Sequence, residues 1–279
     1  MTSSPVLRIG TAGWTLPKQH AHYFPAEGSH LARCATGFNC VEINSSFHRP
    51  HMRKTWERWA TCTPDNFRFA VKIPKTITHQ AKLIDCGGLL QTFLGEALGL
   101  NAGPIPKLGP LLIQLPPKLA FDEGVAHEFF TTFRELYPAE GSDLGLAVCE
   151  PRHASWFAPD VDRLLRSFEI ARVAADPAKG SPLAGKPGGW NGLRYWRLHG
   201  SPRTYYSAYS NAFLKDFAKQ IDTERVKAPA GTWVIFDNTA LGYGTENALM
   251  LWHQVAALDA SGSSDEKPRP RSAKRAKVS

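Results

Sequence analysis

Cysteine is scarce in this chain, which has only five in 279 residues: Cys34, Cys40, Cys62, Cys86 and Cys149. The number is odd and no two cysteines have the C-x-x-C spacing. Both facts argue against a disulfide framework and against a zinc ribbon. We therefore expect reduced thiols and a cytoplasmic protein.

Long apolar runs are also absent. No window reaches the roughly 18 apolar residues that a membrane-spanning helix needs. The first ten residues, MTSSPVLRIG, lack the basic segment followed by an apolar segment that marks a secretory signal. The sequence predicts a soluble protein that makes no membrane contact.

Several common catalytic motifs are missing as well. GTAGW (10–14) contains glycines but is not G-x-G-x-x-G, and neither a Walker loop, a G-x-S-x-G elbow nor an H-E-x-x-H pair occurs. These absences weigh against nucleotide-dependent enzymes and α/β-hydrolases. No cofactor can be assigned from the sequence.

The positive charge is unevenly distributed. Residues 265–279 carry a net charge of +4, and the other 264 residues together also carry only +4 of the total of +8. The end of the chain is rich in Ser, Gly, Pro and charge without apolar periodicity, so we expect a disordered basic tail over residues 259–279. Its two interpretations are an arm that binds the phosphates of nucleic acid and a solubilising segment.

What the sequence does have is a repeated alternation of apolar runs and amphipathic helical patterns. Between most of the runs, apolar residues recur at the 3.6-residue helical period, as in Val125, Phe129, Phe130 and Phe133. The eight runs cover residues 6–10, 40–44, 67–73, 110–115, 144–150, 171–176, 193–199 and 232–237.

Eight strand–helix repeats in about 250 residues predict an α/β protein with a closed parallel (β/α)8 TIM barrel. We expect one domain over residues 5–258. The sixth crossover, PAKGSPLAGKPGGWNG (177–192), is rich in Gly and Pro and predicts a loop in place of a helix. An open doubly wound sheet is the alternative fold.

Charged and polar residues stand where the predicted strands end. In AVCEPRHASW (147–156), a buried strand runs directly into Glu150 and Arg152. A TIM barrel builds its active site from these carboxyl ends, and side chains two residues apart share one face of a strand. The residues that we expect at the barrel mouth are Glu42, Asn44, Ser45, Lys72, Gln114, Glu150, Arg152, Asp176, Arg197, His199, Asp237 and Asn238. The alternative is a purely structural network of ion pairs.

Seven ordered motifs give the chain a resemblance to a known family. They are RIGTAGW (8–14), FNCVEINSSFHRP (38–50), FRFAVKIPKTITH (67–79), LGPLLIQLPP (108–117), AVCEPRHASW (147–156), RLHG (197–200) with YYSAYS (205–210), and FDNT (236–239) with ENAL (246–249). Between about residues 6 and 256 the sequence resembles the YecE-like family. The resemblance implies a TIM barrel with these motifs at its mouth, and it implies no particular activity. Cys149, Pro151 and FDNT depart from the usual family pattern.

The predicted mouth combines cations, carboxylates and rings. The planar guanidinium group of arginine binds phosphate or carboxylate groups through two hydrogen bonds, and carboxylates beside such a bound group can exchange protons with it. We expect Glu42, Glu150, His199 and Asp237 to be catalytic, and the substrate-binding residues to be Asn44, Lys72, Gln114, Arg152, Trp156, Arg197, Tyr206 and Asn238. The sequence thus predicts a hydrolase or lyase acting on a small anionic or phosphate-bearing substrate, with nucleic acid as one form of it.

Two other functions fit the same residues. Glu42, Glu150, His199 and Asp237 come from four strands and could hold a divalent metal in a hydrolase or isomerase, although nearby Lys and Arg would compete for the carboxylates. The barrel could instead bind or sense an anionic ligand without converting it, because a fold alone does not establish catalysis.

Overall fold

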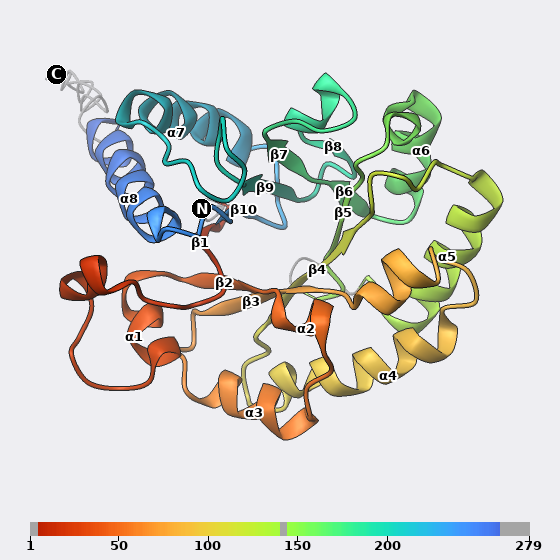
Figure 1. The fold of residues 1–279 in the computed structure, drawn as a ribbon, viewed down its shortest axis with the longest axis horizontal. Coiled ribbons are helices and arrows are strands. Elements are labelled where there is room, and N and C mark those ends of the chain that lie inside the picture. The colour runs from red at the N-terminus through yellow and green to blue at the C-terminus, as the bar shows by residue number, and fades with distance from the viewer. Residues whose placement is uncertain (1–4, 140–143, 263–279) are drawn as a thin grey trace, which may run out of the picture.

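The computed structural model describes residues 5–139 and 144–262, and its centre is a mostly parallel sheet of ten strands (Figure 1). The strands follow the order β7-β9-β10-β1-β2-β3-β4-β5-β6-β8. Their bounds are β1 Leu7–Ala12, β2 Cys40–Ile43, β3 Arg68–Lys72, β4 Leu108–Gln114, β5 Ala147–Glu150, β6 Ile170–Arg172, β7 Ala174–Asp176, β8 Gly188–Gly189, β9 Arg194–Leu198 and β10 Thr232–Phe236.

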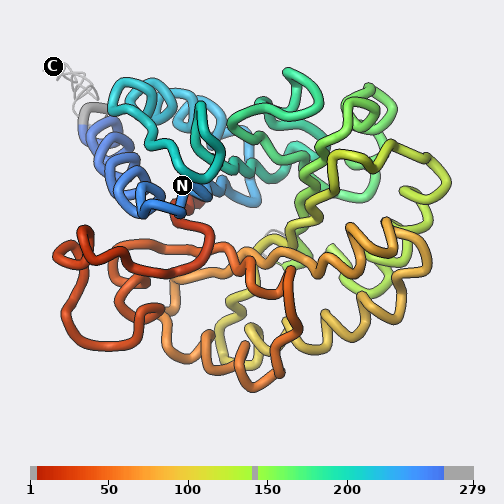
Figure 2. The backbone as a smooth tube through the Cα atoms, viewed as in Figure 1, coloured from red at the N-terminus to blue at the C-terminus, as the bar shows by residue number. Residues whose placement is uncertain are grey.

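The sheet curls until it nearly closes into a barrel. The first strand, β1, pairs in parallel with the last, β10, so the red and blue parts of the chain meet in Figure 2. Strand β6 pairs with β5 and β7 pairs with β9, and only Val173 separates β6 from β7. The predicted α/β barrel is confirmed in this form, and the sheet is not the open doubly wound alternative.

The strand count differs from the predicted eight for two local reasons. The single strand predicted over 171–176 is divided at Val173, where it changes partner: the N–H of Val173 still donates to the carbonyl oxygen of Cys149 on β5 at 2.9 Å, whereas Ala174–Asp176 pairs with β9. The two-residue strand β8 adds an antiparallel pairing with β6. It lies in the Gly- and Pro-rich segment 177–192, which contains one 3-10 helix and no α-helix, as predicted.

Helices surround the sheet, with α3, α4 and α5 along one side and α7 and α8 along another (Figure 1). Side chains cap several of them: Asp122 accepts from the N–H of Val125 at the start of α5, and Ser210 accepts from the N–H of Phe213 at the start of α7. The bounds are α1 His30–Gly37, α2 Ser45–His48, α3 Arg53–Thr61, α4 Gly87–Ala97, α5 Glu123–Leu136, α6 Pro159–Ser167, α7 Asn211–Arg225 and α8 Tyr243–Gly262, with 3-10 helices at Lys18–Tyr23, Leu98–Asn101, Ala154–Phe157 and Pro182–Gly185 and a π-helix at Thr76–Gln80.

The alternation of side chains along the strands divides the core in two. Val41 and Ile43 belong to the larger cluster, which includes helix residues such as Phe130 and Leu251. Their neighbour Cys40 belongs to a smaller cluster inside the barrel, with Ala70, Leu112, Val148, Tyr195 and Trp233. A Cβ on Gly109 would lie 2.5 Å from the Trp233 ring, so this strand position must be glycine for the indole to fill the barrel.

The carboxyl-terminal boundary lies further along the chain than we expected. Helix α8 continues to Gly262, beyond residue 258. From residue 263 onward, the predicted basic tail lies outside the described residues. Within residues 5–139 and 144–262, no helix combines the length and the apolar character needed to cross a membrane.

Candidate functional site

Arg197 on β9 lies at the centre of a buried charge network. Its guanidinium contacts carboxylates from three other strands or strand ends: Glu42 at 2.7 and 3.0 Å, Glu150 at 2.6 Å and Asp237 at 3.1 Å. Burial alone would lower the pKa of Arg197, but Glu42, Glu150 and Asp237 hold it well above its usual range. The sequence placed these four residues at one mouth, and the hydrogen bonds show that they meet there.

Glu42 on β2 is fully buried and has a second partner. The hydroxyl of Tyr195 donates to its Oε2 atom at 2.8 Å. Burial, followed by the charge of Glu42, raises the pKa of Tyr195 well above its usual range, so the phenol stays protonated and able to donate. Tyr195 was not among the predicted site residues, although it lies two residues before Arg197 and shares its strand face.

Glu150, the last residue of β5, is bound by two arginines. Arg152 donates to its Oε1 atom through Nε at 2.8 Å and approaches it through Nη2 at 2.7 Å, while Arg197 binds Oε2. Burial would raise the pKa of Glu150, but Arg197 and Arg152 hold it well below its usual range. Glu150 is therefore an ionised carboxylate at neutral pH.

His199 and Asp237 form a hydrogen-bonded pair. The Nδ1 atom of His199 lies 2.9 Å from Oδ2 of Asp237, and the imidazole is 1% exposed. Burial and Arg197 lower the pKa of His199, but the hydrogen bond to Asp237 and the nearby carboxylate of Glu150 outweigh them and raise it above 6.5. Burial raises the pKa of Asp237, yet Arg197 and His199 bring it below its usual value.

The other imidazole nitrogen of His199 is buried and has no hydrogen-bond partner among the described residues. Its nearest carboxylate oxygen is Oε1 of Glu150, at 3.6 Å. The ring of Tyr205, which the sequence analysis did not select, lies at right angles to the imidazole with centroids 5.9 Å apart. Nε2 of His199 is thus a polar atom available to a ligand.

Lys72, at the end of β3, has its Nζ atom 3.9 Å from the ring centroid of Phe47. Burial and the charge of Arg197 lower its pKa to about 8, and the nearby Glu150, Glu42 and Asp237 only partly oppose this. Within the described chain, no carboxylate oxygen lies within 4.0 Å of its amine. Lys72 therefore adds positive charge to the mouth without a direct ion-pair partner.

Three predicted binding residues lie at the mouth but outside this network. Gln114 pairs with Glu150 in the β4–β5 register, and its amide makes only a 3.5 Å contact with the carbonyl of Leu115. The Oδ1 atoms of Asn44 and Asn238 are buried without a partner among the described residues. Asn238 also donates to Oδ1 of Asn247, a residue that the sequence analysis did not assign to the site.

A small cavity adjoins the network on the β5–β7 side. It has a volume of about 10 Å³, close to that occupied by a single water, and Glu150, Arg152, Lys179 and His199 all line it. Lys179 comes from the irregular sixth crossover, where neither periodicity nor a strand end marks a residue as part of a site. Three of these four polar groups are cationic when His199 is protonated.

Comparison with known proteins places this barrel in a family. The model of the family described as "Protein of unknown function DUF72" matches residues 8–273. The chain belongs to the DUF72 family. This agrees with the resemblance to YecE-like proteins seen in the sequence motifs.

Individual relatives support the assignment. The DUF72 protein is 34% identical over 111 residues to the UPF0759 protein YecE of Escherichia coli K12, a match that covers 40% of this chain and 38% of that one. It is 25% identical to the UPF0759 protein YunF of Bacillus subtilis, over 87% of this chain and 92% of the relative. A solved DUF72 structure from Enterococcus faecalis V583 superposes with a TM-score of 0.74 at 19% identity, covering 90% and 96% of the two chains, and so shows the same fold.

Two residues of the DUF72 protein do not lie where the sequence analysis expected them. Trp156 is 1% exposed, packs against Phe121 and donates its indole N–H to the carbonyl of Leu119, so it is a core residue with no ring face available for stacking. Tyr206 is 38% exposed, and its ring lies beneath the guanidinium of Arg203, 4.0 Å from the ring centroid, in place of a contact with the carboxylate network. A ring near a strand end can turn toward the core or the surface, and the sequence does not distinguish these orientations.

The divalent-metal interpretation gains no support from this geometry. In the part of the chain that the structure describes, no group of three or more His, Cys, Asp or Glu side chains is placed to hold a metal ion. The carboxylates of Glu42, Glu150 and Asp237 instead contact guanidinium groups.

Proposed function

We propose that this DUF72 protein is a hydrolase or lyase that binds the phosphate group of its substrate at the mouth of the barrel. The observation that carries the proposal is the Nε2 atom of His199, which is buried and has no hydrogen-bond partner among the described residues. The other nitrogen of the ring contacts Asp237, and the imidazole lines a cavity with Glu150, Arg152 and Lys179. A buried polar atom without a partner is costly, and a ligand oxygen would satisfy it.

In this proposal, His199 is the general acid and base. Asp237 accepts a hydrogen bond from Nδ1, which fixes the ring and stabilises the imidazolium form. The raised pKa of His199 increases the protonated fraction of its imidazole. In the hydrolase form of the proposal, a water molecule attacks phosphorus while the bond from phosphorus to the leaving oxygen breaks, and protonated Nε2 donates its proton to that oxygen. The proton that the attacking water loses returns to the neutral imidazole, so His199 acts in turn as acid and base. Glu150 and Asp237 are ionised because their pKa values are lowered, so they orient and balance charge and do not donate protons.

Arg152 and Lys179 supply the positive charge for the phosphate. Their cavity has space for about one oxygen atom, so one phosphate oxygen would enter it while the rest of the group faces the loops. Lys72, which lacks a direct ion pair among the described residues, would add a further positive charge beside the substrate. For this role we treat β6 and β7 as one interrupted strand and leave out the two-residue antiparallel β8, which makes the barrel eight-stranded with its site at the usual end.

The test compares the wild type with His199→Gln on p-nitrophenyl phosphate, bis(p-nitrophenyl) phosphate and a single-stranded oligonucleotide. We expect turnover of at least one class and a fall of about 100-fold or more in kcat for the variant, with retained binding of inorganic phosphate. His253→Gln is the matched control because His253 is exposed on α8, away from the network. Phosphate binding without turnover of any class would favour the non-catalytic anion-binding barrel, and no binding of phosphate would overturn the proposal.

A further inference from the structure

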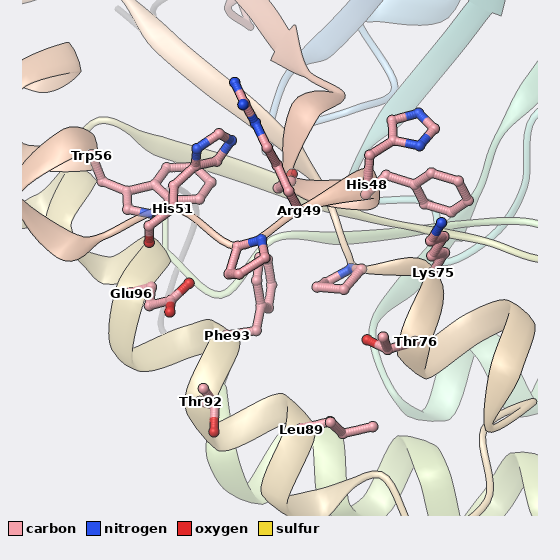
Figure 3. A pocket seen from close by; sticks show the side chains of 14 residues that line it. His48, Arg49, His51, Trp56, Lys75, Thr76, Leu89, Thr92, Phe93 and Glu96 are labelled. Atoms are coloured by element: carbon pink, nitrogen blue, oxygen red, sulfur yellow. The ribbon is translucent and has the colours of Figure 1, made fainter.

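A second, larger cavity lies on the β2–β3 side of the barrel mouth. It has a volume of about 220 Å³ and lies among the loop after β2, the loop after β3 and helix α4. Figure 3 shows its labelled side chains: Phe93, Thr92 and Leu89 come from α4, and His48, Arg49 and His51 from the segment after β2. Both loops follow carboxyl ends of barrel strands, so this cavity opens at the same end of the barrel as the charge network.

The walls of the cavity are mainly aromatic and aliphatic. Phe47, Trp56 and Phe93 contribute rings, and Pro50, Pro74 and Leu89 contribute aliphatic surface. Trp56 and Phe93 are buried in the core, which fixes their orientation, whereas Leu89 is 42% exposed at the opening. A rigid aromatic cavity of this kind suits a flat apolar group.

The rim of this cavity is cationic. Arg49 and Lys75 lie on it with one carboxylate, Glu96, and the imidazoles of His48 and His51 lie nearby (Figure 3). His51 is held by Ser45, whose Oγ is 2.8 Å from Nε2. An apolar interior with a positive rim fits a ring that carries a negative group better than it fits a neutral hydrocarbon.

Phe47 joins the two sites. Its ring lines the cavity, and the same ring lies 3.9 Å from the Nζ atom of Lys72. The neighbouring Ser46 donates to the backbone carbonyl of Lys72 at 2.7 Å, which fixes the β2 loop against the end of β3. The Lys72 amine thus lies between the charge network and the aromatic cavity, so a phosphate bound at this amine would lie next to the ring of Phe47.

We infer that the cavity lined by Phe47, Trp56 and Phe93 is the subsite for a planar aromatic ring of the phosphate-bearing substrate, so that the substrate class is an aryl or nucleobase-bearing phosphate. The inference rests on the proposed function, because it takes the phosphate to be bound at the neighbouring network. It adds the chemical identity of the rest of the substrate.

The test measures dissociation constants for inorganic phosphate and phenyl phosphate by calorimetry at one ionic strength. Burial of a phenyl ring should make phenyl phosphate bind about 10- to 100-fold more tightly than inorganic phosphate. Thr92→Trp places an indole into the cavity from an exposed position of α4, and it should remove this preference while leaving the affinity for inorganic phosphate unchanged. The matched control is Gln91→Trp, which adds the same side chain at an exposed position of α4 that does not line the cavity.

The outcomes separate the two proposals. Equal affinities for the two ligands in the wild type, or a preference that survives Thr92→Trp, would overturn the aromatic subsite while the phosphate site stands. Failure of the wild type to bind inorganic phosphate would overturn the phosphate site. Arg49→Gln should weaken phenyl phosphate binding several-fold, and Arg58→Gln, on the exposed face of α3, is its control. An unchanged affinity in Arg49→Gln would show that the cationic rim does not contribute to ligand binding.

Discussion

Arg197 and Glu42 form a two-pronged ion pair inside the barrel, with hydrogen bonds of 2.7 and 3.0 Å and neither side chain more than 1% exposed. Burial of such a pair has a large desolvation cost, which only complete pairing offsets. Removing one member therefore leaves the other as an uncompensated buried charge.

Arg197→Met should lower the free energy of unfolding by about 3 to 5 kcal/mol, because it leaves Glu42 without its arginine. Urea denaturation monitored by circular dichroism would measure this. The double variant Glu42→Gln/Arg197→Met should recover part of the loss. Arg163→Met is the control, since Arg163 pairs with Asp160 on the surface of α6, where such pairs contribute about 0 to 1 kcal/mol. A loss no larger than the control's would contradict the structural importance of the pair.

Arg152→Met should behave differently, because Glu150 keeps its 2.6 Å hydrogen bond to Arg197 when Arg152 is removed. We expect a smaller loss of stability than for Arg197→Met, together with loss of phosphate binding. Arg152→Lys should restore only part of the affinity, because a point charge does not reproduce the fork of a guanidinium. Thermal melts and phosphate calorimetry on the same samples would check both expectations. Unchanged phosphate affinity in Arg152→Met would show that Arg152 does not bind the phosphate group.

The amine of Lys72 predicts a characteristic pH dependence of stability. Its pKa is about 8 in the folded protein and 10.5 when unperturbed, so the unfolded chain binds more protons between these values and stability rises with pH across that window. Below pH 8 the charged amine opposes folding by at most on the order of 3 kcal/mol. Lys72→Met should therefore be more stable than the wild type at pH 7, and the difference should shrink from pH 8 to 10.5. Lys54→Met, at an exposed position of α3, should show no such trend.

His199 should titrate above pH 6.5, which NMR of the imidazole Hε1 signal can follow. Asp237→Asn should lower this midpoint, because it replaces the carboxylate that accepts the Nδ1 hydrogen with a neutral amide while Arg197 continues to repel the imidazolium. Protonated His199 stabilises the folded state fully below pH 6.5, and this contribution is lost as the pH rises through the folded-state pKa. A midpoint at or below 6.5 in the wild type would contradict the assignment of His199 as the acid.

The sequence predicted the strands and the convergence of their charged ends, because apolar runs and a two-residue alternation are local properties. It did not predict the direction of the aromatic rings. Tyr195 lies on the same strand face as Arg197 and was missed, whereas Trp156 was assigned to the site and lies in the core. Lys179 was missed because the irregular segment that carries it has no periodicity, and only the folded chain brings it to His199.

Because the strand is interrupted at Val173, the sheet has only short hydrogen-bonded ladders on both sides of this residue. Strand β6 has three paired positions with β5 and β7 has three with β9, whereas β1 and β10 share five. Short ladders open locally at lower free energy than long ones, so amide hydrogens of residues 170–176 should exchange with solvent faster than those of β1 and β10. Val173 and Ala175 also line the small cavity beside Arg152 and His199. The wall beside this cavity is thus built on short ladders, so under the proposed function it can adjust locally when one phosphate oxygen enters.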